Sequence, residues 1–128
     1  MSIIGNAVTF GGGSGEPELL WTNPAPSSAF YEQDVIVPDA YDAYLMSVRY
    51  RTYVGAVVTS YVPKNASNFL VPTFWLSDSN LSISAREITS ISGGVISFGW
   101  GKYGAGSYMS RNCEFGIPLS IWGVKWTI

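Results

Sequence analysis

The stretch Ala43-Tyr44-Leu45-Met46-Ser47-Val48-Arg49-Tyr50-Arg51 decides the fold class of this chain. Two sets of side chains alternate along it: Tyr44, Met46, Val48 and Tyr50 on one parity, and Leu45, Ser47, Arg49 and Arg51 on the other. A period of two is that of a β-strand, whose successive side chains point to opposite faces of a sheet. The stretch therefore predicts a strand with one dry face and one wetter face.

Short apolar and aromatic runs lie on both sides of this stretch, separated by clusters of Gly, Pro, Asn, Asp and Ser that favour turns. We expect strands at residues 19–22, 30–37, 43–51, 54–62, 69–76, 81–91, 95–98 and 118–128. Pro72 lacks an N–H for a ladder hydrogen bond, so its run is expected at a sheet edge or a bulge. About eight short strands without helical periodicity predict an all-β fold, an antiparallel β-sandwich of jelly-roll type.

The first residues differ in composition from the rest. Two short apolar pieces precede the run Gly11–Gly15, which is typical of a flexible linker. We interpret residues 1–18 as an N-terminal tail with a glycine-rich hinge, and residues 19–128 as one sandwich domain. A glycine turn between two small strands is the alternative for the tail.

Composition excludes several classes of protein. Aromatic residues make up 15% of the 128 residues, charged residues only 12%, and the net charge is −2, which excludes a disordered chain. The seven basic residues form no basic stripe, so we expect no nucleic-acid partner. No apolar run approaches the roughly 20 residues of a membrane span, so we expect no membrane partner. No signal peptide is visible, and the single Cys113 cannot pair internally, which indicates folding in a reducing cytoplasm.

The chain has no histidine, which removes the usual general base and the commonest metal ligand. Its few carboxylates form no evident catalytic pair: Asp39 and Asp42 are expected to cap a turn, and Glu87 to pair with Arg86. We therefore expect no enzyme, although two distant acids converging in a groove would suggest a glycosidase. The best local cluster of metal ligands, Asp78-Ser79-Asn80, lacks the spacing of a calcium loop, so we expect no metal and no cofactor.

Residues 99–104 fit the string GxGxxG, but no helix comes after them as a dinucleotide site requires. We expect residues 99–106 to form a hairpin loop or a binding loop instead. Exposed Trp and Tyr often stack against sugar rings, and they are also enriched at protein interfaces. Trp100 and Tyr103, and after them Trp75 and Tyr108, are the residues expected to face a ligand. Tyr53 and Tyr61 are also expected near turns or on mixed strands. Five other rings are expected in the core: Trp21, Phe30, Tyr44, Phe69 and Phe98.

Several segments of this chain, in their order along the sequence, resemble segments of a known protein family. The segment Leu19–Phe30 reads LLWTNPAPSSAF and is similar to the LLWTN-x-P-x-S-x-F opening of small phage and prophage proteins of gut bacteria. The segment Pro38–Tyr44, with its "YDA" turn, resembles the next segment of those proteins. Four further segments are similar as well: Ile3–Thr9, Arg86–Thr89, Gly93–Phe98 and Ile117–Lys125. Typical members have an aromatic residue before the final glycine, where this chain has Trp122, and the chain extends past Lys125 with Trp126-Thr127-Ile128.

The resemblance implies a virion component such as a tail, fibre-tip or head-fibre protein, made in the cytoplasm of the host bacterium. It implies a homotrimer that contacts other virion proteins and binds host surface polysaccharide, and it supplies no catalytic residue. Avidity from several weak sugar sites would then hold the particle to its host. Two alternatives stay open: a purely structural head-decoration or baseplate component without a ligand, and a monomeric carbohydrate-binding module.

Overall fold

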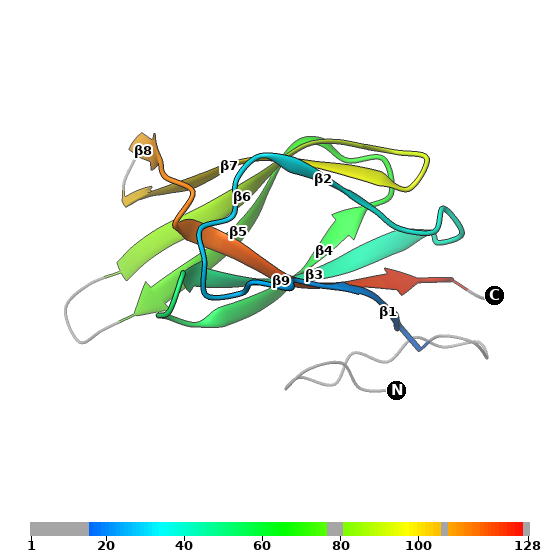
Figure 1. The fold of residues 1–128 in the computed structure, drawn as a ribbon, viewed down its shortest axis with the longest axis horizontal. Coiled ribbons are helices and arrows are strands. Elements are labelled where there is room, and N and C mark those ends of the chain that lie inside the picture. The colour runs from blue at the N-terminus through cyan, green and yellow to red at the C-terminus, as the bar shows by residue number, and fades with distance from the viewer. Residues whose placement is uncertain (1–15, 77–80, 106–107, 127–128) are drawn as a thin grey trace.

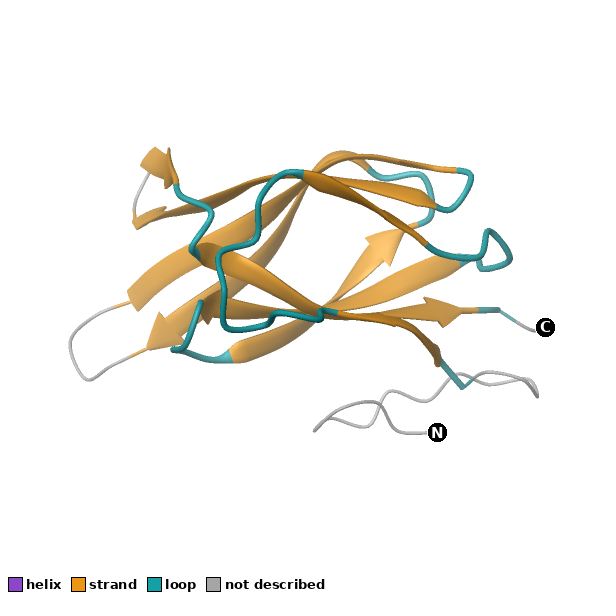
Figure 2. Ribbon diagram, viewed as in Figure 1, coloured by secondary structure: helices purple, strands orange, loops and turns teal. Residues whose placement is uncertain are grey.

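The computed structural model describes residues 16–76, 81–105 and 108–126 and has no helix in them. The fold is an antiparallel β-sandwich of jelly-roll-like type, as the sequence predicts (Figures 1 and 2). The described residues form nine strands: β1 (Glu18–Thr22), β2 (Gln33–Ile36), β3 (Ala43–Arg51), β4 (Val57–Pro63), β5 (Ser67–Leu76), β6 (Leu81–Ser92), β7 (Val95–Ala105), β8 (Tyr108–Arg111) and β9 (Phe115–Val124).

The strands form two sheets that pack face to face. The first sheet has the order β1-β9-β3-β4, and the second has the order β2-β7-β6-β5. Strands β2 and β8 share one edge of β7, since β2 pairs with its residues 95–98 and β8 with its residues 102–105. The opposite edge strand of the second sheet is β5, which confirms the edge position predicted from Pro72.

One half of the space between the sheets is an apolar core. On β3 the predicted dry face points inward, and Tyr44, Met46 and Val48 are completely buried there. Ile88 of β6 and Ile96 of β7 meet them from the second sheet and are equally buried. Burying one large aliphatic side chain contributes about 1.5–3 kcal/mol, so this cluster supplies much of the stability of the fold.

The other half of this space holds a buried arginine. Arg86 of β6 has no exposed surface, and its guanidinium donates to the carbonyl oxygens of Gly116, Gly99 and Phe115 at 2.8, 2.9 and 3.0 Å. A longer contact of 3.4 Å reaches the carbonyl of Cys113. Burial lowers the pKa of Arg86 from its ordinary value. Main-chain carbonyls thus solvate a charge that would otherwise be costly to bury.

Polar pairs continue this region toward the end of β5. The hydroxyls of Thr73 and Ser84 lie 2.7 Å apart, and that of Ser84 also donates to the carbonyl of Tyr50 at 2.9 Å. The expected pairing of Glu87 with Arg86 is wrong, because adjacent residues of a strand point to opposite faces. Glu87 instead forms an ion pair with Lys102 at 3.4 Å.

The glycine-aromatic segment 99–106 is not the loop that the sequence predicts. Up to Ala105 it continues β7, paired with β6 on one side and β8 on the other. Gly101 faces Arg86, and a Cβ there would come within 2.3 Å of the carbonyl oxygen of Phe115. Glycine is present in this strand because the arginine and its acceptors leave no room for a side chain.

None of the described residues belongs to a helix that is long and apolar enough to span a membrane. The expected tail, residues 1–18, is described only from residue 16 onward, and β1 starts within it at Glu18.

Candidate aromatic contact site

Four aromatic rings form a continuous chain at the end of the sandwich where β5 ends. Tyr50 of β3 meets two rings edge-on: Trp75 of β5, with centroids 5.8 Å apart, and Phe115 of β9, at 5.5 Å. Tyr103 of β7 stacks on Phe115 with centroids 4.3 Å apart. These four residues are called the aromatic cluster below. It joins two of the residues predicted to face a ligand, Trp75 and Tyr103, through two rings for which no such role was predicted.

Strand alternation explains why these rings meet. Tyr50 has the same parity as the buried Tyr44, so it points between the sheets, and Trp75 follows the buried Thr73 in the same way. The cluster therefore continues the interior outward to the end of the molecule. Phe115 is only 7% exposed, whereas Trp75 and Tyr103 are 39% and 37% exposed. The two predicted residues are thus the accessible ends of a buried aromatic chain.

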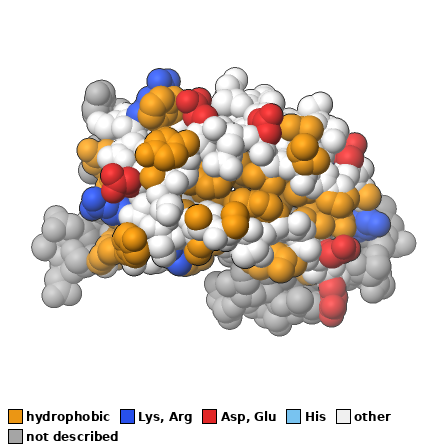
Figure 3. All heavy atoms as spheres, in the orientation of Figure 1, with side chains coloured by type: hydrophobic (Ala, Val, Ile, Leu, Met, Phe, Trp, Pro, Cys, Tyr) orange, Lys and Arg blue, Asp and Glu red, His pale blue; other side chains and the backbone are white. Residues whose placement is uncertain are grey.

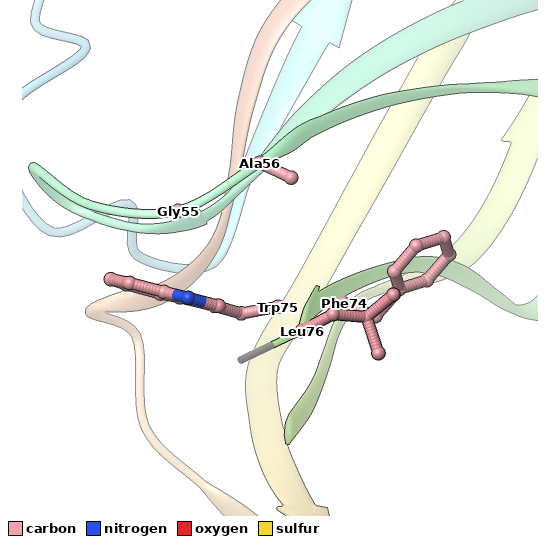
Figure 4. A pocket seen from close by; sticks show the side chains of 5 residues that line it. All are labelled: Gly55, Ala56, Phe74, Trp75 and Leu76. Atoms are coloured by element: carbon pink, nitrogen blue, oxygen red, sulfur yellow. The ribbon is translucent and has the colours of Figure 1, made fainter. Parts of the chain in front are cut away.

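A groove opens beside Trp75 (Figure 4). It has a volume of about 430 Å³ and is lined by Gly55 and Ala56 of the β3–β4 turn and by Phe74, Trp75 and Leu76 of β5. Gly55 has φ of 102°, and a Cβ there would lie 2.5 Å from Cβ of Tyr50 and 3.1 Å from Cε3 of Trp75. Only glycine allows the turn to lie this close to the indole ring.

The charges near the aromatic cluster are paired with each other. The guanidinium of Arg51 lies 4.8 Å from the centroid of the Phe115 ring and 4.0 Å from the carboxylate of Glu114. Both charged side chains are about half exposed. The described residues that line the groove include no carboxylate. The groove suits a flat apolar group or an aliphatic side chain, which it would bind through contact area and ring stacking.

The outer face of the β5–β6 hairpin is also apolar. Its exposed large hydrophobic residues are Leu70, Phe74, Leu76 and Leu81, between 42% and 65% exposed. The paired Glu87 borders them, because it lies opposite Leu70. We call these four residues the apolar face, and Phe74 and Leu76 belong to the groove as well. The few charged side chains visible in Figure 3 agree with the low charge of the chain. Exposed apolar residues that adjoin one another are typical of contact surfaces.

Trp100 lies apart from the aromatic cluster. It precedes the inward-facing Gly101 on β7, so its side chain points to the outer face of the second sheet, opposite to Tyr103. There the guanidinium of Arg111 lies 5.3 Å from its ring centroid, within the range of a cation–π contact. Trp100 and Tyr103, predicted as one loop surface, therefore lie on opposite faces of a strand.

The fourth predicted residue, Tyr108, begins β8 with its backbone opposite Ala105, and its side chain lies outside the described residues. The cluster Asp78-Ser79-Asn80 lies outside them too. Within the described ranges, no group of three or more Cys, Asp or Glu side chains is placed to hold a metal ion. Cys113 is a buried, unpaired thiol, and Arg86 lies 3.8 Å from its sulfur.

Sequence reasoning missed Tyr50 because alternation places it on the dry face of its strand, and it missed Phe115 because no strand was expected there. The observed pairing of β3 with β9 places Arg51 opposite Phe115 and so brings the two strand ends together. Alternation within one strand gives no signal for this pairing. Comparisons with protein-family models, curated proteins and solved structures give no match for this chain.

Proposed function

We propose that this chain is a non-enzymatic component of a phage virion that works by surface contact. It is made in the cytoplasm of the host bacterium, assembles as a homotrimer with other virion proteins, and attaches the particle to host surface glycans. The proposal combines the motif resemblance with an apolar, weakly charged surface. The sandwich is a rigid support, and its exposed rings and apolar side chains do the binding.

One observation carries the contact role: the groove beside Trp75 continues into the apolar face. The groove-lining residues Phe74, Trp75 and Leu76 are between 39% and 65% exposed, although each is large and apolar. Burying such side chains against a partner contributes about 25 cal/mol per Å² of apolar area before the costs of association. Among the described residues that line the groove there is no acidic pair, so a binding role fits this lining better than glycoside hydrolysis.

The first test is the mass of the purified protein in solution, measured by size-exclusion chromatography with light scattering. We expect a trimer that a charged substitution in the groove, Leu76→Glu, converts to monomers. The matched control is Tyr31→Glu, at an exposed position outside both the groove and the apolar face. A monomer at all concentrations would contradict the homotrimer and favour a monomeric carbohydrate-binding module.

A purely structural component without a ligand is the second candidate. The described lining of the groove consists of apolar residues and glycine and favours it, because a sugar needs polar partners whereas another protein chain does not. Binding of labelled protein to host cells separates the two candidates. We expect the wild-type protein to bind and a Trp75→Ala, Tyr103→Ala, Trp100→Ala variant to bind less. A wild-type protein that assembles but does not bind cells would favour the structural role.

A further inference from the structure

A second aromatic surface lies on the outer face of the first sheet. Tyr61 of β4 is paired with Leu45 and has the parity opposite to the buried Val62, so its ring points away from the core. Trp126, just beyond β9, stacks against it with the ring planes 9° apart and the centroids separated by 6.5 Å. This is the geometry of an offset pair. Tyr61 and Trp126 are 49% and 54% exposed, and we call them the platform.

The backbone holds the platform in position. The N–H of Trp126 donates to a carboxylate oxygen of Asp42 at 2.7 Å, and the N–H of Asp42 donates to the carbonyl of Val124 at 2.7 Å. This double link fixes the residues just after β9 against the start of β3. Two half-exposed rings are therefore presented in a fixed, nearly parallel arrangement, which lowers the entropy cost of binding a flat ligand.

The surroundings of the platform define the chemistry of that ligand. The Asp42 carboxylate adjoins the platform, because one of its oxygens accepts from the N–H of Trp126. No described residue donates to its other oxygen, which can accept from a hydroxyl. The neighbouring cation, Lys125, lies over the ring of Tyr41. An acidic ligand would meet the carboxylate unfavourably, whereas a neutral ligand with C–H faces and hydroxyl groups would stack on the rings and donate to Asp42.

We propose that the platform is the site where this protein binds neutral glycans, with one pyranose ring over Trp126 and the next toward Tyr61. The proposal rests on the attachment function above and places the sugar affinity of each single site on the platform. The groove beside Trp75 is left for protein contacts, so substitutions there weaken binding to host cells through lost assembly and avidity, not through a lost sugar site. If the groove serves assembly and the platform serves attachment, every copy in an oligomer keeps its sugar site accessible, as multivalent binding requires.

Isothermal titration of the purified protein with cellohexaose, maltohexaose and chitohexaose tests the proposal. We expect weak binding of at least one oligosaccharide, and affinity about tenfold lower in Trp126→Ala and Tyr61→Ala because a stacked ring is lost. Trp126→Phe keeps a ring and is expected to retain part of the affinity. The main-chain link to Asp42 does not depend on the side chain of Trp126, so these variants should fold. Tyr31→Ala, at an exposed tyrosine on another surface, is the matched control.

The outcomes separate this site from the proposed function. Affinity that is lost in Trp75→Ala and kept in Trp126→Ala overturns the platform and leaves attachment standing. Binding of oligogalacturonate in preference to the neutral sugars overturns the assigned ligand class. No binding of any oligosaccharide by the wild-type protein overturns the platform as well. The attachment function is then judged separately, from binding of wild-type protein to host cells.

Discussion

The two halves of the space between the sheets are built in different ways. Around Met46, Ile88 and Ile96 the sheets are joined by close-packed apolar side chains. Around Arg86 they are joined by hydrogen bonds from one guanidinium to carbonyls on both sheets. Apolar packing tolerates small changes of shape, whereas a buried charge depends on every acceptor staying in place. The difference predicts that substitutions will be far more costly in the polar half.

The largest effect is expected for Arg86→Met. The carbonyls of Gly99, Phe115 and Gly116 would lose their donor in a space closed to solvent. We expect the free energy of unfolding to fall by about 3–5 kcal/mol, measured by urea denaturation.

Two further variants sharpen this result. Arg86→Lys keeps the charge but lacks the planar set of donors, so it should lose most of the same stability. Ile96→Val in the apolar half should cost only about 0.5–1.5 kcal/mol. If Arg86→Met costs no more than Ile96→Val, the two halves do not differ as described.

A smaller loss is expected for Ser84→Ala. Its hydroxyl serves both Thr73 and the carbonyl of Tyr50, and their loss should cost about 1–2 kcal/mol in thermal or urea unfolding. The comparison is Ser47→Ala, at a residue that is also buried but whose hydroxyl pairs with Thr59 alone among the described residues. Equal losses at the two serines would show that the second hydrogen bond of Ser84 adds nothing.

The apolar half contains one polar defect, and removing it should stabilise the protein. The hydroxyl of Tyr44 is buried without a hydrogen-bond partner among the described residues. Tyr44→Phe should therefore raise the free energy of unfolding by up to about 1 kcal/mol. An unchanged or lower stability would indicate that the hydroxyl is satisfied. Tyr31→Phe, at an exposed tyrosine, is the control.

The same residue predicts a dependence on pH. Burial, with a smaller contribution from the charge of Asp39, raises the pKa of Tyr44 above its ordinary value near 10. The pKa of Tyr44 is higher in the folded state than in the unfolded state, so its stabilising contribution is complete below the unfolded-state pKa of about 10. This contribution is lost as the pH rises through the folded-state pKa. As the pH rises above about 10, the Tyr44→Phe variant should therefore lose less stability than the wild type. The loss that persists in the variant should come partly from Tyr41, whose pKa is also raised by burial.

The smallest effect is expected for an ion pair outside both halves. Lys64 and Asp39 lie 3.6 Å apart with both side chains largely exposed. Lys64→Gln should change the free energy of unfolding by less than about 0.5 kcal/mol, and by still less in high salt. A loss above about 1 kcal/mol would contradict the expectation that the stability of this protein depends mainly on contacts between the sheets and little on exposed ion pairs.

The apolar half could be predicted from the sequence because alternation and burial agree there. The run 43–51 coincides with β3, and Phe30, Tyr44 and Phe98 are buried as expected. Trp21 and Phe69 pack against the same cluster while partly exposed.

The polar half could not be predicted, because the residue type gives the wrong answer. An arginine beside a glutamate suggests a surface ion pair, and glycine-rich segments suggest loops. Here tertiary contacts decide: Arg86 turns inward to carbonyls, and the glycines of β7 allow that approach. The prediction that Trp100 and Tyr103 share one surface fails for the same reason. A loop at residues 99–106 would not fix the directions of their side chains, whereas the observed strand places the two rings on opposite faces.

The position of β9 has a consequence for the synthesis of the protein. This strand follows all the other described strands along the chain, yet it lies inside the first sheet between β1 and β3. The carbonyls that bind Arg86 on the first sheet, those of Phe115 and Gly116, also belong to it. Neither sheet packing nor charge solvation is complete until residues 115–124 have left the ribosome. The domain must therefore fold after translation of β9, and nascent chains that stop before Phe115 would expose an uncovered β3 and an unsolvated arginine.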